Sequence, residues 1–151
     1  MLILQRPADL ANYVGKKLGT SDWIEITQDM IDAFANLTGD HQWVHVDTER
    51  AKHEGPGGKT IAHGFLVLSF VPGWVPKIYK VEKRSRALNY GVNRVRFTAM
   101  LPVGSRVRGH LSIKEVAFIE GGVRFITEAE IELEGSTRPA CVAETVTVLY
   151  E

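Results

Sequence analysis

A nearly unbroken apolar stretch from Gly64 to Tyr79 constrains the fold more than any other segment of this sequence. Its apolar residues fall on every side of a helix, and they are Phe65, Leu66, Val67, Leu68, Phe70, Val71, Trp74, Val75 and Ile78. A helix without a polar face has to be enclosed by other structure rather than lie on a surface. The stretch also contains helix breakers that should kink or end the regular helix near Val71, and these are Pro72, Gly73 and Pro76.

Segments with a period of two predict the strands that would enclose this helix. Apolar and polar residues alternate through 106–113 and 123–133, so each segment has one dry face. The Glu-Gly-Gly sequence at 120–122 predicts a hairpin turn between them. Residues 88–97 supply an earlier strand and residues 140–150 a last one. We therefore expect an α+β fold in which a curved antiparallel sheet wraps around one central apolar helix.

The chain ahead of the central helix predicts shorter elements. A brief helix should end at Gly15, and residues 23–26 have the composition of a short strand. Thr27 suits an N-cap and Gly39 suits a helix end with positive φ, so a helix is expected between them. Residues 41–59 have no regular period and carry several glycines, which predicts a long loop. Long loops in compact domains are usually functional.

Size and charge limit the class of protein. With 151 residues, of which 44% are hydrophobic, the chain is long enough for one domain, residues 1–151, with a sizeable core. Eighteen basic and eighteen acidic residues cancel, so no domain-wide field favours nucleic acid or an anionic membrane as a partner. The substrate must therefore be held by local contacts.

The cysteine content and the hydropathy pattern predict a cellular location. Cys141 is the only cysteine, which excludes an internal disulfide, and its apolar strand predicts an inert buried thiol. No apolar run reaches the roughly 18 residues of a membrane span, and the apolar start at 1–4 is too short for the core of a signal peptide. We expect a soluble cytoplasmic protein.

Acid–base side chains follow the helix that should end at Gly39. Asp40 stands directly after it, His45 comes five residues later, and Gly64 opens the apolar helix. Either an Asp or a His alone in such a turn is most often a solvated loop residue. Together they offer what hydration of an alkene conjugated to a thioester requires, namely a base for water, an acid for Cα and donors for the enolate oxygen. Asp40 and His45 would move the protons, and backbone N–H groups near Gly64 would bind the enolate.

Two further polar residues border the apolar helix. His63 directly precedes it, where the expected task is to cap or orient the helix start. Ser69 must find a partner for its hydroxyl, and a bond to the carbonyl four residues earlier is the plain alternative to a functional role. We expect no metal site, because the histidines are irregularly spaced and no cysteine accompanies them. No Gly-x-Gly-x-x-Gly or P-loop sequence indicates a nucleotide cofactor.

Two motifs carry a family resemblance that covers nearly the whole chain. The motifs are Gly39-Asp40-x-x-x-Val44-His45-x-Asp47 and Ile61-x-His63-Gly64. They resemble those of the MaoC-like, (R)-specific enoyl-CoA hydratases. Gln42 and Trp43 stand where that family usually has Asn and Pro, a version that resembles the nodulation-protein-N-like branch.

The resemblance implies a fold, a reaction and a set of partners. It implies a hot-dog fold and the reversible hydration of trans-2-enoyl thioesters to (R)-3-hydroxyacyl thioesters, within fatty acid metabolism. It implies no cofactor, since coenzyme A, or an acyl-carrier protein, enters only as part of the substrate. It also places Ser69 behind the catalytic pair, where it steadies the active-site loop. Basic residues such as Lys59 or Arg94 would meet the phosphates of coenzyme A.

Two other functions stay open, and the edge of the sheet predicts a partner. A hot-dog thioesterase would hydrolyse the thioester without the Asp-x-x-x-x-His pairing, and a non-catalytic acyl-thioester binding module would not need His45. The strand at 88–97 carries Tyr90 and Val92 and is a poor candidate for an exposed edge. We therefore expect a homodimer whose edges pair across a two-fold axis. By resemblance, the acyl tunnel lies near that boundary.

Overall fold

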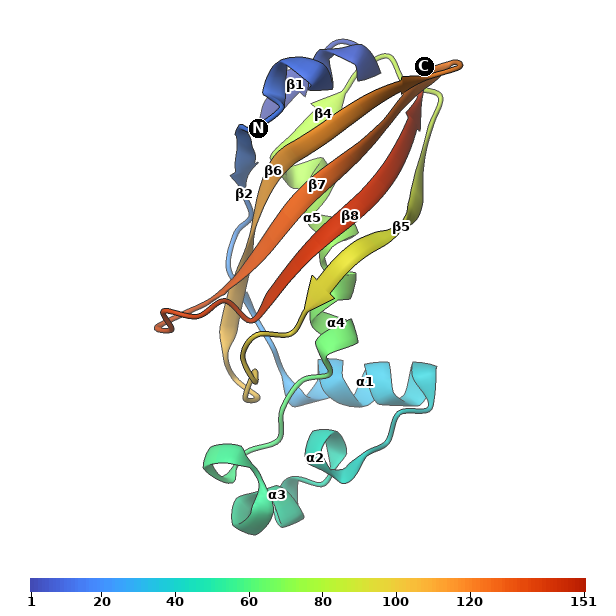
Figure 1. Cartoon of the computed structure of the whole chain (residues 1–151). Coiled ribbons are helices and arrows are strands. Elements are labelled where there is room, and N and C mark those ends of the chain that lie inside the picture. The colour runs from blue at the N-terminus through green and yellow to red at the C-terminus, as the bar shows by residue number, and fades with distance from the viewer.

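A long curved sheet and a broken helix behind it dominate the computed structural model, which describes residues 1–151 (Figure 1). The sheet has six strands, and the order β2-β6-β7-β8-β5 forms its main path, with β3 paired to β6. All of these pairs are antiparallel. The strands are β2 (Lys17–Thr20), β3 (Ile24–Glu25), β5 (Arg86–Arg96), β6 (Arg106–Ile119), β7 (Gly122–Leu133) and β8 (Cys141–Tyr150).

The four strands predicted from alternation are confirmed, and the dry face is the one that alternation indicated. Along β6, Val107, Leu111 and Ile113 are fully buried, whereas their polar neighbours lie on the other face. The predicted hairpin turn between β6 and β7 is present, and Gly121 adopts a φ of +74° that suits glycine. The register of this hairpin determines which residues face the helix.

The central helix is divided at Phe70 into α4 (Gly64–Ser69) and α5 (Val71–Ile78), which confirms the predicted kink near Val71. One side of it packs on the sheet, where Gly109 of β6 leaves the room that the Trp74 ring occupies. The single chain does not enclose the helix completely. Phe65 is 67% exposed, and the helix face that carries it has no cover within the chain.

The helix that precedes the site forms as expected, but the predicted loop after it does not. In α1 (Gln28–Thr38), the Thr27 side chain accepts a bond from the backbone N–H of Met30 at 3.3 Å, and Gly39 ends the helix at a φ of +83°. Residues 41–59 were expected to form a loop but contain α2 (Trp43–Val46), α3 (Thr48–Glu54) and the 3-10 turn η2 (Pro56–Gly58). These short helices escape a periodicity test because each spans only one or two turns.

The N-terminal segment lies at the far end of the sheet from α1, α2 and α3 (Figure 1). The predicted brief helix is the 3-10 helix η1 (Pro7–Tyr13). Ahead of it, β1 (Leu2–Leu4) pairs in parallel with β4 (Tyr79–Val81) in a separate two-stranded sheet. None of the helices has both the length and the hydropathy that crossing a membrane would require.

Candidate active site

The structure brings Asp40, His45 and His63 together beneath the start of α4. Asp40 follows the end of α1, His45 lies in α2, and His63 is the last residue before α4. One nitrogen or carboxylate oxygen from each of the three lies within 4.8 Å of the others. Both histidines are buried, whereas the Asp40 side chain is 56% exposed. The cluster is therefore open to solvent on its carboxylate side.

A backbone carbonyl fixes the tautomer of His45. Its Nδ1 lies 2.7 Å from the carbonyl oxygen of Ile61. Because a carbonyl oxygen can only accept, Nδ1 carries a proton and donates it, so that in the neutral imidazole Nε2 is the acceptor. The Ile61 N–H in turn donates to the Val44 carbonyl at 3.0 Å, which holds the two segments in register. His45 thus presents a basic nitrogen in a defined orientation.

His63 supports the other two residues rather than the helix that follows it. Although it occupies the N-cap position of α4, its side chain makes no capping bond, so the capping part of the prediction is wrong. Its Nε2 instead lies 3.0 Å from the Asp40 carbonyl oxygen and donates to it. Its ring stacks on that of His45, with centroids 3.8 Å apart. The buried Nδ1 of His63 has no hydrogen-bond partner.

The Asp40 carboxylate is held by a turn of its own. Its Oδ1 accepts from the backbone N–H of Gln42 at 3.4 Å, and its Oδ2 lies 3.9 Å from His63 Nε2. The Asp40 N–H donates to the Thr38 hydroxyl at 3.4 Å. These contacts direct one oxygen of the carboxylate toward the stacked imidazoles.

The three side chains do not suit a metal ion. Two stacked rings aim their nitrogen lone pairs side by side rather than at one point, and their planes differ by only 25°. The arrangement fits proton transfer better than coordination.

A cleft of about 560 Å³ opens beside His45 and Gly64. Phe97, from the segment after β5, also lines it, and its ring explains the glycine. A Cβ added at Gly64 would lie 2.6 Å from the ring carbons of Phe97, so only glycine allows this contact. Phe97 in turn meets Phe65 edge to face, with ring centroids 5.5 Å apart. Sequence reasoning missed Phe97, because nothing in its neighbourhood marks it.

Gln28 is a second residue that sequence reasoning missed. From the first turn of α1, its Nε2 donates to the His45 carbonyl at 2.8 Å. Its Oε1 accepts from the hydroxyl of Thr60, which is 1% exposed, at 2.6 Å. The Gln28 amide therefore ties together the two segments that orient His45. Its partners lie 17 and 32 residues away in the chain, so no local pattern reveals them.

Two other predicted residues have different surroundings. The Ser69 hydroxyl donates to the Phe65 carbonyl at 2.6 Å, which is the plain alternative given above. Its role in steadying the site stays a prediction.

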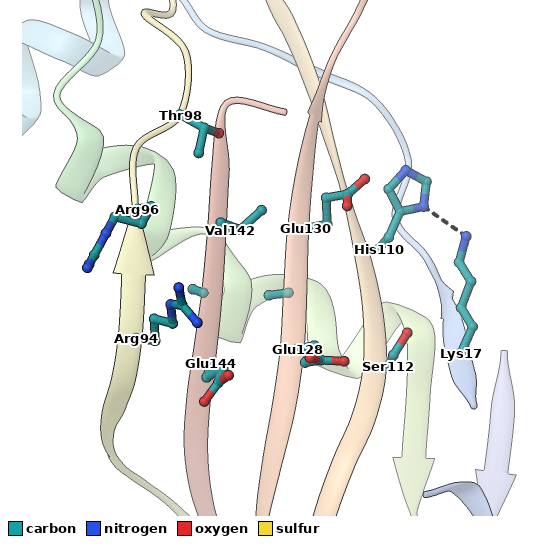
Figure 2. Close-up of a pocket in the computed structure, with 12 residues that line it drawn as sticks. Lys17, Arg94, Arg96, Thr98, His110, Ser112, Glu128, Glu130, Val142 and Glu144 are labelled. Atoms are coloured by element: carbon teal, nitrogen blue, oxygen red, sulfur yellow. Dashed lines mark hydrogen bonds between the residues drawn. The ribbon is translucent and has the colours of Figure 1, made fainter. Parts of the chain in front are cut away.

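Arg94 does not line the cleft beside His45. It lies on the outer face of the sheet, in a hollow of about 640 Å³ that also contains Glu128 and Glu144 (Figure 2). The arginine that lines the cleft is Arg138.

Comparisons with known proteins agree on a family and a fold. The sequence profile described as MaoC like domain matches residues 9–132. The chain is 48% identical over 147 residues to 3-hydroxyacyl-thioester dehydratase Z of Mycobacterium tuberculosis, covering 97% of each chain. It is 42% identical over 145 residues to Nodulation protein N of Rhizobium leguminosarum bv. viciae, covering 94% of this chain and 89% of the relative.

Solved structures give the same picture of the fold. A monoamine oxidase regulatory protein from Archaeoglobus superposes with a TM-score of 0.80 at 25% identity, covering 99% of this chain and 97% of the other. An unliganded R-hydratase from Pseudomonas aeruginosa superposes with a TM-score of 0.70 at 22% identity, covering 91% and 82%. These likenesses confirm the predicted hot-dog fold.

Proposed function

This chain belongs to the MaoC-like dehydratase family, and from that membership we propose that it adds water reversibly to trans-2-enoyl thioesters, giving (R)-3-hydroxyacyl thioesters. A relative 48% identical over nearly its full length is named a 3-hydroxyacyl-thioester dehydratase, which identifies the chain as a hydro-lyase. The (R) stereochemistry of the proposal is supported by solved structures of the same fold that are named R-hydratases.

The observation that carries the proposal is the oriented, unprotonated Nε2 of His45 beside the Asp40 carboxylate. As the oxygen of water bonds to Cβ of the enoyl group, Nε2 takes a proton from that water. The imidazolium so formed is stabilised by the neighbouring carboxylate. Nε2 then gives this proton to Cα: the imidazolium N–H bond breaks, the Cα–H bond forms, the enolate returns to the thioester carbonyl, and His45 is again neutral. The pair therefore ends the reaction as it began.

The thioester oxygen becomes negative as the C–O bond forms, and Gly64 supplies the donor we assign to it. Gly64 is the first residue of α4, where a backbone N–H has no carbonyl one turn earlier to bond. Because α4 has only six residues, this N–H group contributes more than the helix dipole does. Gly64 and His45 line the same cleft, so one thioester can meet both. The proposed reaction needs no separate cofactor, because coenzyme A or an acyl-carrier protein enters only as part of the thioester substrate.

A crotonyl-CoA assay tests this function against the two alternatives. Hydration removes the enoyl absorbance without releasing thiol, whereas a thioesterase releases free coenzyme A and a binding module does neither. We expect loss of the enoyl absorbance alone. Free thiol appearing at the same rate as substrate loss would instead identify a thioesterase.

We also propose that the active form is a homodimer. β5 is the last strand of the sheet path, and its outer edge has no partner within the chain. Three of its large apolar residues are exposed, with Leu88 at 48%, Tyr90 at 70% and Val92 at 51%. The uncovered face of α4 carries Phe65, which is also exposed. A second copy paired at this edge would satisfy the backbone and cover the apolar side chains in both chains.

A further inference from the structure

Two hollows lie along the central helix, beyond the residues that line the cleft beside His45 and Gly64. Their volumes are about 280 and 310 Å³, and they adjoin, because Pro72, Val75 and Tyr79 line both; together they form one cavity. Leu68 and Pro72 follow Gly64 at four-residue spacing along the central helix, and Tyr79 comes directly after the end of α5. At 1.5 Å per helical residue, the stretch from Gly64 to Ile78 is roughly 20 Å long. The cavity is thus placed to receive the distal part of a long acyl chain.

Two largely buried residues with a hydroxyl group line this cavity. Tyr79 is 6% exposed and Thr127 is 4% exposed, and neither hydroxyl is engaged in a side-chain hydrogen bond within the chain. The only polar side-chain atom that is both sealed and unpartnered is His63 Nδ1. The two hydroxyls therefore keep accessible surface, and the only space that both residues line is the hollow of about 280 Å³. Solvent or a ligand in this hollow can therefore bond to both hydroxyls.

We infer that this cavity selects acyl thioesters whose distal chain carries an uncharged oxygen substituent, a hydroxyl or a keto group, over thioesters with a plain alkyl chain. The inference rests on the proposed function and names its substrate class. The substituent would bond to the hydroxyls of Tyr79 and Thr127. A plain chain would displace solvent from both hydroxyls and leave them unbonded, which weakens binding.

The lining of the cavity favours a neutral substituent rather than a charged one. None of the residues around the hollow of about 280 Å³ is charged, and besides Tyr79 and Thr127 its polar side chains include Asn89, Thr145 and Thr147. A carboxylate placed there would lose its hydration without a cation to replace it. Burial raises the pKa of the Tyr79 phenol to about 12, so it remains protonated and able to donate at neutral pH. The charge of Arg84 acts in the opposite direction on the Tyr79 pKa and is the smaller effect; Arg84 lines only the outer hollow and is exposed to solvent.

Matched thioesters test this inference. Long-chain trans-2-enoyl-CoA would be assayed in three forms, with a plain methyl end, a hydroxyl near the end of the chain, or a terminal carboxylate. We expect kcat/KM to be about tenfold higher for the hydroxylated form than for the plain form, mainly through a lower KM. Equal values for these two forms, or the highest value for the carboxylate, would overturn the inference.

Isosteric variants assign the preference to the two hydroxyls. Tyr79→Phe and Thr127→Val each remove one hydroxyl and keep the volume, so the preference should fall toward unity while hydration of the plain chain stays the same or improves. Tyr13→Phe, a change in η1 away from the cavity, is the matched control and should keep the full preference. A preference that survives in the double variant Tyr79→Phe/Thr127→Val would contradict the assignment.

Two measurements separate this inference from the proposed function. Crotonyl-CoA, whose acyl chain is short, should be hydrated equally well by the wild type and the cavity variants. Calorimetric binding of the plain and hydroxylated thioesters to His45→Gln does not depend on turnover. Tighter binding of the hydroxylated thioester to His45→Gln supports the inference, even if the wild type does not hydrate crotonyl-CoA. Equal binding of the two thioesters contradicts the inference, even if the wild type does hydrate crotonyl-CoA.

Discussion

The imidazole ring of His63 lies flat against that of His45, with centroids 3.8 Å apart and planes inclined by 25°. His63 is itself held in place, because its Nε2 donates to the Asp40 carbonyl at 3.0 Å. The Nδ1 of His45 lies 2.7 Å from the Ile61 carbonyl oxygen. The His45 ring is therefore fixed from one face by His63 and at one edge by the backbone.

Replacing either member of the catalytic pair should remove most of the activity. We expect Asp40→Asn and His45→Gln each to lower kcat for crotonyl-CoA hydration by about 10²–10⁴-fold, the usual contribution of a general acid or base. The double variant should lose little more than one single variant, because the two groups act as a unit. His53→Gln, on the exposed side of α3, is the control and should keep wild-type turnover. Near-normal kcat in either single variant would refute the mechanism.

Gln28 should act as a positioning residue for His45. We expect Gln28→Leu to lower kcat more than it changes KM, because the His45 carbonyl and the Thr60 hydroxyl both lose their partner. In this variant the buried Thr60 hydroxyl has no hydrogen-bond partner, which should lower the free energy of unfolding by about 1–3 kcal/mol. Adding Thr60→Val should recover part of the melting temperature but not of kcat. A kcat that recovers together with the melting temperature would mean that Gln28 has only a structural role. The control is Gln5→Leu, at an exposed site, which should change neither quantity.

The contact between Gly64 and Phe97 allows the effect of a Gly64 substitution on stability to be separated from its effect on kcat. Gly64→Ala should lower both the melting temperature and kcat, since its Cβ would lie 2.6 Å from the Phe97 ring. Overpacking of this kind typically costs about 1–3 kcal/mol. In Gly64→Ala/Phe97→Ala the clash is absent, so the melting temperature should match that of Phe97→Ala. If kcat also matches that of Phe97→Ala, the backbone at Gly64 is not the enolate site.

A lysine on the free edge of β5 should separate the proposed homodimer. Leu88 is 48% exposed in the single chain, and Leu88→Lys would place a charge where the partner strand is expected. Light scattering should then report a monomer of 16.8 kDa, with activity falling as dimer content falls. Phe118→Lys, at an exposed residue near the end of β6, is the control. A wild-type protein that is monomeric and fully active at low micromolar concentration would rule out the proposal.

Cys141 should resist thiol reagents while the protein is folded. Its side chain is fully buried, and burial raises the pKa of the thiol to about 11. The unfolded chain loses this proton near its ordinary pKa of 9.0, so the unfolded state binds fewer protons between about pH 9 and 11. Stability should therefore fall as the pH rises through that window. Labelling at pH 8 should follow the rate of unfolding, and rapid labelling of the native protein would contradict this.

Local pattern was enough for the elements that have a strong period or a definite end. The alternation in β6 and β7 indicated the dry face of the sheet because each strand buries one side only. Thr27 and Gly39 marked α1 because cap chemistry depends only on neighbouring backbone groups. The helices at 43–54 went unpredicted because they are short and are stabilised by packing, as the fully buried Ala51 shows, rather than by propensity.

The sequence by itself determined which side chains could do the chemistry, since Asp40 and His45 stand in one short motif after a helix end. It could not determine how they are held. The stack of His63 on His45, the Gln28 amide and the Phe97 ring over Gly64 each join segments that are remote in the chain. Such contacts depend on how the sheet and helices pack against one another, and no local pattern encodes that packing. Only the tertiary structure decided which neighbours orient Asp40 and His45, the two residues proposed to be catalytic.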